Sequence, residues 1–331
     1  MKSTLNRLIQ HEVLSKEESK EILYKIADGK YNSSQISAFL TVYMMRSISV
    51  KELEGFRDAL LELCMRIDLT EFDAIDLCGT GGDNKDTFNI STLASFVTAG
   101  AGISVAKHGN YGVSSNCGSS NVMEYLGIKF SNNESFLKKC LEKAGICILH
   151  APLFHPAMKN VAPIRKELAV KTFFNMLGPM VNPSFPNNQI VGVFSLELAR
   201  IYGYLYQNSN KNFAILHSLD GYDEISLTGS TKIISNSKEK LIEPKDFGLS
   251  TLNKDDILGG ASIKSSAKIF LDVLSGKGTN AQNQVVCANS AIAISTKMNI
   301  SLKSGYENAM ESLISGRGLK SLKTLQKISS I

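Results

Sequence analysis

The N-terminal part of the chain has its apolar residues at helical spacing. In residues 15–29, 33–48 and 49–67, apolar side chains recur every three or four positions, as on one face of an α-helix. Ser15 stands where a helix N-cap is expected, and Gly29 stands where a helix C-terminus favours glycine. The pattern predicts an all-helical domain over residues 1–70, without a strand.

From Phe72 onward, short apolar runs alternate with longer amphipathic runs. Gly127 and Gly145 follow two amphipathic runs, where helix C-caps favour glycine. Such alternation is typical of an α/β domain whose mainly parallel sheet is flanked by helices. The predicted strands are residues 72–78, 103–109, 146–151, 189–195, 213–218 and 231–237, and the predicted helices between them are residues 92–102, 119–127, 136–145 and 197–208.

One more helical run is predicted between the third and fourth strands. It begins with Pro163 in a favourable first-turn position and continues to the pair Gly178 and Pro179. Its apolar length indicates that residues 163–183 pack onto the N-terminal helices. The α/β domain is then predicted to comprise residues 71–162 and 184–331.

Composition and charge narrow the class of protein. The 331 residues are 43% hydrophobic, enough for one large domain with a smaller partner. The net charge of +5 is mild and the lysines are spread along the chain, so no nucleic-acid partner is expected, whereas phosphorylated substrates are compatible. The N-terminus lacks the apolar core of a signal peptide, and no apolar run is long enough to span a membrane.

The cysteines point to the compartment. The chain has six cysteines, which include no CxxC pair and stand in apolar or helix-like contexts. Such usage is typical of a reduced protein rather than of a disulfide scaffold. We therefore expect a cytoplasmic protein without membrane contact.

The segment DLCGTGGDNKDTFNIST, residues 76–92, joins a predicted strand to a predicted helix through a glycine-rich loop. The chain lacks the GxxxxGK[ST] run of a Walker loop, and this loop lacks the last glycine of a GxGxxG fingerprint. Backbone amides of its glycines can face phosphate oxygens, and Ser91 and Thr92 offer hydroxyls at the helix start. The segment fits a phosphate cradle, and a purely structural turn and cap is the alternative.

Polar side chains also follow the next predicted strand. Lys107, His108, Asn110 and Ser119 stand in the run VAKHGNYGVSSNCGSSN. Because ligands gather beyond the carboxyl ends of parallel strands, this run and the glycine-rich loop are expected to converge on one crevice, where Lys107 meets the same anion. Taken singly, Lys107 also fits a surface lysine, and His108 fits a satisfied polar residue.

Two further segments carry charged side chains. Asp223 and Glu224 stand side by side in a loop after a predicted strand. Adjacent carboxylates in a loop can bind Mg²⁺ together with substrate phosphates, and a solvated acidic turn is the alternative. Arg165 lies in the first turn of a predicted helix, where it can reach a ligand carboxylate or face solvent.

Recognisable runs follow one another along nearly the whole chain: GTGGD, TFNIST, KHGN, SSNCGSS, HPAMK, APIRKELAVKTFFNMLGP, GYDEIS and LSGKGTNAQNQVVCANSAIAI. In sequence and in order, these runs resemble those of the anthranilate phosphoribosyltransferase family, which has the nucleoside phosphorylase/phosphoribosyltransferase-like fold. Three positions depart from the common pattern of that family: Tyr111 stands in place of an arginine, Asn121 in place of an aspartate and Asn84 in place of a glycine.

The resemblance implies a small helical domain and a larger α/β domain, assembled as a homodimer through the helical part. It implies that anthranilate and phosphoribosyl pyrophosphate are the substrates. The phosphoribosyl group would pass to the anthranilate amine with release of pyrophosphate, which is the second step of tryptophan biosynthesis from chorismate. The implied cofactor is Mg²⁺, with two ions per active site.

The resemblance also implies a role for each matching residue, and it assigns no residue as a general base. Ser91 and Glu224 would hold one Mg²⁺, and Asp223 with Glu224 would hold the second. Gly79, Asn110 and Arg165 would contact anthranilate. The implied phosphoribosyl-pyrophosphate ligands are Gly79, Gly82, Asp83, Thr87, Asn89, Ile90, Ser91, Thr92, Lys107, His108, Gly109, Asn110 and Ser119.

Two other classes of protein compete with this interpretation. A pyrimidine nucleoside phosphorylase has related architecture and also joins a glycine-rich loop to a sugar and an anion, but the KHGN, APIRKELA and DE runs favour the transferase. A non-catalytic protein that binds nucleic acid would need a clustered basic or aromatic face, and the sequence shows none.

Overall fold

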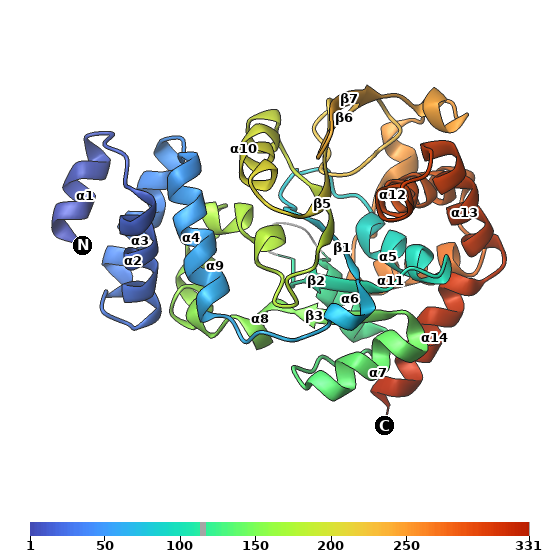
Figure 1. Ribbon diagram of the computed structural model, residues 1–331, viewed down its shortest axis with the longest axis horizontal. Coiled ribbons are helices and arrows are strands. Elements are labelled where there is room, and N and C mark those ends of the chain that lie inside the picture. The colour runs from blue at the N-terminus through green and yellow to red at the C-terminus, as the bar shows by residue number, and fades with distance from the viewer. Residues whose placement is uncertain (113–116, 331) are drawn as a thin grey trace.

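The computed structural model describes residues 1–112 and 117–330. Residues 114–116, which belong to the SSNCGSS motif, lie outside the described residues. Figure 1 shows the N-terminal helices grouped at one end of the long axis and the C-terminal helices at the other end. The sheet lies between these two groups.

The predicted N-terminal helices are all present. Capping boxes fix the starts of three of them: the side chains of Ser15, Asn32 and Ser49 each accept a first-turn N–H, and their own backbone N–H groups donate to the side chain three residues on. Gly29 has the left-handed conformation expected after a helix, with a φ of +69°. The helices are α1 (Lys2–Ile9), α2 (Lys16–Ala27), α3 (Ser33–Met45) and α4 (Val50–Leu63).

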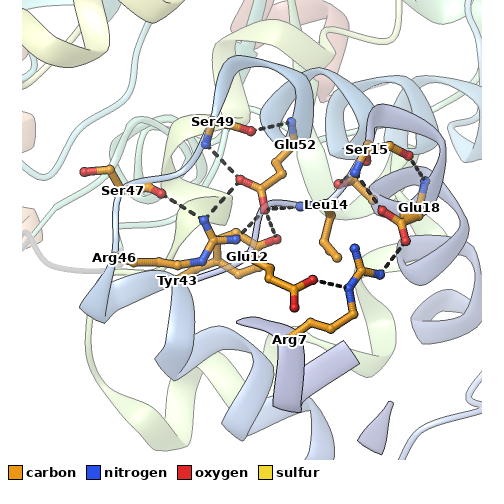
Figure 2. Close-up of polar contacts among 11 residues, drawn as sticks. Arg7, Glu12, Leu14, Ser15, Glu18, Tyr43, Arg46, Ser47, Ser49 and Glu52 are labelled. Carbon is orange, nitrogen blue, oxygen red and sulfur yellow. Dashed lines mark hydrogen bonds and ion pairs between the residues drawn. The ribbon is translucent and has the colours of Figure 1, made fainter. Parts of the chain in front are cut away.

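A buried carboxylate ties these helices together (Figure 2). Glu52, in the first turn of α4, is fully buried, and its Oε1 accepts from the Leu14 N–H (3.1 Å) and the Tyr43 hydroxyl (2.8 Å). Arg46, just after α3, forms an ion pair with the same carboxylate. A buried charge is tolerated only when it is paired and hydrogen-bonded, so this network fixes the α1–α2 turn against α3 and α4.

The described residues form a seven-stranded sheet with the order β3-β2-β1-β4-β5-β6-β7. The pairs from β3 to β5 are parallel, whereas β6 and β7 pair antiparallel at one edge. The predicted α/β fold class with a mainly parallel sheet is confirmed, and β7 has no counterpart in the prediction. The strands are β1 (Ile75–Gly79), β2 (Val105–Gly109), β3 (Ile146–His150), β4 (Asn188–Gly192), β5 (Asn212–Ser218), β6 (Thr231–Ser235) and β7 (Glu239–Ile242).

Helices flank this sheet. Helix α5 is almost entirely buried, because it packs against β1 on one side and against α12 and α14 on others. Among the described residues, no helix is long and apolar enough to cross a membrane. The helices of this part are α5 (Ile90–Gly100), α6 (Ser119–Tyr125), α7 (Glu134–Ala144), α8 (Ala151–Phe154), α9 (Ala162–Leu168), α10 (Leu196–Gln207), α11 (Ile263–Leu274), α12 (Asn280–Met298), α13 (Leu302–Ile314) and α14 (Arg317–Ser329).

The single helix predicted from Pro163 onward is wrong. Helix α9 ends at Leu168, because Ala169 takes a left-handed conformation with a φ of +53°. The chain then runs extended into two short 3₁₀ turns, Phe173–Met176 and Gly178–Val181. The Thr172 N–H donates to the Asn175 side chain over 3.1 Å, and this local bond competes with continued helix.

The same segment packs against the N-terminal helices. The ring of Phe173 stacks on Phe56 of α4 with centroids 4.5 Å apart, and it meets Phe39 of α3 edge to face at 6.0 Å. These rings belong to a hydrophobic cluster that also includes residues of β4 and α10. The boundary between the helical domain and the α/β domain stays a prediction, because this cluster runs across it.

Substitution of Glu52 tests the role of the buried network. Glu52→Ala removes the carboxylate and leaves Arg46 buried without its partner, so we expect the free energy of unfolding to fall by about 3–5 kcal/mol. Glu62→Ala on α4 is the matched control, because its ion pair with Lys20 is exposed and such pairs contribute about 0–1 kcal/mol. Urea denaturation measures both values. Equal losses in the two variants would contradict the account.

Candidate active site

The residues predicted to bind substrates and metal meet in one cavity of about 280 Å³. It lies at the carboxyl ends of β1 and β2, the edge at which parallel α/β sheets bind ligands. The role of each residue stays a prediction. Every predicted site residue lines the cavity: Gly79, Gly82, Asp83, Thr87, Asn89, Ile90, Ser91, Thr92, Lys107, His108, Gly109, Asn110, Ser119, Arg165, Asp223 and Glu224.

Neighbouring strands β1 and β4 end in a pair of glycines, Gly79 and Gly192, which are register partners. Asp223, in the loop after β5, lies directly over this pair. A Cβ atom on Gly192 would come within 1.6 Å of the Asp223 carbonyl oxygen, and one on Gly79 would come within 2.6 Å of Asp223 Oδ2. The acidic loop can therefore cross the edge of the sheet only because both strands end in glycine.

The glycine-rich loop after β1 folds onto the same carboxylate. Gly81, Gly82 and Asn84 have left-handed conformations with φ of +63°, +76° and +60°, which suit glycine and asparagine. The Gly81 N–H donates to Asp223 Oδ2 over 2.7 Å. One loop amide is thus used by the protein itself, so the loop is a structural turn as well as a candidate phosphate cradle.

The loop leads into the N-terminus of α5. The Ser91 N–H donates to Glu224 Oε1 over 2.8 Å, and a carboxylate is favourable at a helix N-terminus. The Asn89 side-chain amide donates to the Cys117 carbonyl over 2.9 Å. This bond links the glycine-rich loop to the loop after β2, called the second loop below. Ser91 and Glu224 therefore lie side by side in the cavity wall.

Carboxylates concentrate negative charge in this wall. Burial and then the charge of Asp83 raise the pKa of Asp223 to about 7. Burial and the charges of Asp223 and Asp83 also raise the pKa of Glu224. The described residues include no group of three or more His, Cys, Asp or Glu side chains arranged to hold a metal ion. Mg²⁺ typically takes one or two carboxylates plus substrate phosphates, and the pair Asp223 and Glu224 fits that donor set.

Lys107 and His108 lie in strand β2, just before the loop that follows it. Lys107 is buried, and its ammonium donates to the Leu77 carbonyl oxygen over 2.6 Å. His108 Nδ1 lies 3.1 Å from the Gly178 carbonyl oxygen, so Nδ1 carries the proton and Nε2 does not. Burial lowers the pKa of His108 to about 3, and the neutral ring is a poor source of a proton at neutral pH.

The second loop is anchored by the residues that depart from the family pattern. Asn121 Oδ1 accepts from the N–H groups of Gly112 and Gly118, each over 3.0 Å. The Tyr111 hydroxyl donates to the Glu124 carboxylate over 3.3 Å. Both side chains therefore make bonds at the described ends of this loop, next to Asn110 and Ser119 of the cavity wall.

Arg165 brings a positive charge into the cavity from α9. Its guanidinium donates to Asn175 Oδ1 over 3.0 Å and lies 5.6 Å from the centre of the Phe174 ring. Arg165 Nε has no hydrogen-bond partner among the described residues. Burial lowers the pKa of Arg165 to about 10, which still leaves the side chain charged at neutral pH.

The sequence did not identify all of the residues that line the cavity. Phe174 and Asn175 were assigned to a continuous helix, and Gly178 was interpreted only as the signal that ends it. Cys117 and Gly118 stand beside Ser119 in the SSNCGSS motif. Gly81 was expected to face phosphate together with the other loop glycines, and the unpredicted lining residues are Cys78, Thr80, Asp86, Phe88, Tyr111, Gly112, Cys117, Gly118, Ala151, Phe174, Asn175 and Gly178.

The fold and this site define a class of protein. Residues 71–319 match the model of the glycosyl transferase family, a/b domain, and residues 2–64 match that of the glycosyl transferase family, helical bundle domain. The chain belongs to this glycosyl transferase family. Within it, the chain is a member of the anthranilate phosphoribosyltransferases, as the following similarities show.

Similarity extends over whole chains. An anthranilate phosphoribosyltransferase of Flavobacterium johnsoniae is 70% identical over 329 residues, which are 99% of this chain and 100% of the relative. The Saccharomyces cerevisiae enzyme in complex with PRPP and Mg superposes with a TM-score of 0.91 at 30% identity, over 99% of this chain and 97% of that one. Its complex with 4-fluoroanthranilate gives 0.87 at 29% identity with the same coverage.

Proposed function

We infer that this protein transfers the phosphoribosyl group of 5-phosphoribosyl 1-pyrophosphate to the amine of anthranilate. The products are N-(5-phosphoribosyl)-anthranilate and pyrophosphate, in the second step of tryptophan biosynthesis from chorismate. One observation carries the inference: the glycine-rich loop, the acidic pair and Arg165 line a single cavity. The identity to an anthranilate phosphoribosyltransferase over the whole chain, and the ligands of the yeast structures, support it.

The chemistry of this transfer calls for positioning and charge stabilisation. The anthranilate amine already carries a lone pair that can attack the ribose carbon, and pyrophosphate leaves with its electron pair. The residues of the cavity then have to hold the two substrates in line and offset the charge on the leaving group. No residue needs to act as a general base, and burial, which lowers the pKa of His108 to about 3, makes His108 a weak base, consistent with that.

Magnesium is the cofactor of the reaction. Bound Mg²⁺ would neutralise charge that develops on the departing pyrophosphate. For its number and ligands, we propose two ions, one held by Ser91 and Glu224 and the second by Asp223 and Glu224. The contact between Ser91 and Glu224 and the raised pKa of both carboxylates support this assignment, because each cation would relieve repulsion.

The substrate contacts are proposed from the position of each residue in the cavity wall. Arg165, with its buried charge, would bind the anthranilate carboxylate, aided by Gly79 and Asn110. Lys107 is a cation beside the acidic pair and would face the anionic substrate. The remaining proposed phosphoribosyl-pyrophosphate ligands are Gly79, Gly82, Asp83, Thr87, Asn89, Ile90, Ser91, Thr92, His108, Gly109, Asn110 and Ser119.

Assembly and location are further parts of the proposal. The N-terminal helices expose apolar side chains, among them Ile9, Met44 and Met45, which supports a homodimer formed through the helical domain. Light scattering should then give twice the mass of the 36.1 kDa chain, and the mass of a monomer would refute the proposed homodimer.

All six cysteines are free thiols in the described part of the chain, which supports a cytoplasmic location.

The reaction itself is tested by following anthranilate fluorescence. We expect the signal to decay only when phosphoribosyl pyrophosphate and Mg²⁺ are both added to the purified protein. Pyrophosphate should appear in equal amount. Phosphate-dependent cleavage of thymidine or uridine, without loss of anthranilate, would instead make the protein a nucleoside phosphorylase.

Substitution of Arg165 tests the anthranilate site. Arg165→Ala should raise the KM for anthranilate about tenfold to a hundredfold, because a hydrogen bond to a charged group contributes about 1.5–3 kcal/mol. The KM for phosphoribosyl pyrophosphate should change little. Asn175→Ala is the matched control, since it removes the partner of Arg165 but keeps the charge. An unchanged anthranilate KM in Arg165→Ala would refute the assigned role.

The acidic pair is tested by its dependence on pH. Below the pKa of about 7, Asp223 is protonated, so Mg²⁺ must displace a proton in order to bind. The Mg²⁺ concentration for half-maximal rate should therefore rise as the pH falls from 8 to 6, up to about tenfold per pH unit below 7. In Asp223→Asn, this requirement should be higher at pH 8 and should depend less on pH. The same metal titration in wild type and variant would mean that Asp223 only holds the loop through its bond to the Gly81 N–H and binds no metal.

A further inference from the structure

Lys171 makes a contact that the proposed function does not use. It lies in the extended segment between α9 and the Phe173–Met176 turn, and its ammonium donates to the carbonyl oxygen of Gly82 in the glycine-rich loop. The two residues are far apart in sequence. A Cβ atom on Gly82 would meet the Lys171 side chain at 3.3 Å, so the aliphatic part of the lysine also lies against the loop.

The bond fixes one peptide plane of the loop. In a trans peptide the carbonyl and the following N–H point in opposite directions. The Gly82 carbonyl points toward Lys171, which lines a separate cavity of about 760 Å³ together with Asn84 and Arg46. The N–H of Asp83 therefore points away from Lys171. Gly82 and Asp83 both line the substrate cavity, whereas Lys171 does not.

Lys171 is itself held in place from both sides. The Ala169 N–H donates to the Arg165 carbonyl over 3.1 Å, and the Thr172 N–H donates to Asn175 over 3.1 Å. The ammonium also lies 5.9 Å from the centre of the Phe194 ring, after β4. The lysine is thus a fixed cation next to a loop whose glycines permit several conformations.

We propose that Lys171 is a positioning residue of the phosphate-binding loop: by holding the Gly82 carbonyl, it turns the Asp83 N–H toward the pyrophosphate of the substrate. Without the lysine, the peptide between Gly82 and Asp83 is free to rotate, and the donor is lost from the cavity for part of the time. The inference rests on the proposed function, because it takes a pyrophosphate as the ligand of the loop.

Lys171→Met keeps most of the side-chain volume and removes the donor. We expect it to raise the dissociation constant of phosphoribosyl pyrophosphate with Mg²⁺ about tenfold in calorimetry without anthranilate, and the KM for that substrate by a similar factor. The KM for anthranilate should change less than about twofold. Lys171→Arg should restore binding, because it again offers a donor, and Lys171→Gln is a second neutral variant in case Lys171→Met folds poorly.

Lys166→Met is the matched control. Lys166 is exposed on α9, so this variant loses the same charge without touching the loop, and its affinity should equal that of wild type. An unchanged dissociation constant in both neutral Lys171 variants would overturn the inference, as would equal rises in the KM of both substrates. Binding of phosphoribosyl pyrophosphate without consumption of anthranilate would refute the transfer reaction alone. A wild-type protein that does not bind phosphoribosyl pyrophosphate would refute both.

Discussion

The close approach of Asp223 to the ends of β1 and β4 is the constraint on which the site depends. Gly79 and Gly192 are partners in the sheet, and a side chain on either would collide with Asp223. With glycine at both positions, the acidic loop crosses the edge of the sheet and accepts the Gly81 N–H. Asp223 and Glu224 thereby reach a cavity that is built mainly from residues distant in sequence.

This arrangement buries two carboxyl groups where a cation is needed. Burial and the charge of Asp83 raise the pKa of Asp223, and burial with the charges of Asp223 and Asp83 raises the pKa of Glu224, so the acidic pair is poorly satisfied by the protein alone. The Ser91 N–H at the start of α5 and the charge of Lys107 offset part of that cost. A metal ion bound together with pyrophosphate would offset the rest, which makes metal binding and substrate binding interdependent.

Periodicity and cap residues were enough to predict the helix between Ser15 and Gly29 and strands β1 to β6, because each buries a continuous apolar face or run. Strand β7, which is mostly exposed, was missed. It failed at residues 169–175, where a left-handed Ala169 and the bond between Thr172 and Asn175 override helical spacing. The site residues were found through motifs and a family resemblance. Position 79 requires glycine because the side chain of Asp223, which is far along the chain, lies against it. No local sequence pattern could have predicted that requirement.

The most direct test of the account is a crystal structure with phosphoribosyl pyrophosphate and Mn²⁺ in place of Mg²⁺, because Mn²⁺ can be located by its anomalous scattering. The account predicts anomalous peaks beside the carboxylates of Asp223 and Glu224, with pyrophosphate oxygens completing the coordination and the ribose in the cavity at the ends of β1 and β2. Manganese bound elsewhere, or pyrophosphate bound away from the glycine-rich loop, would contradict it.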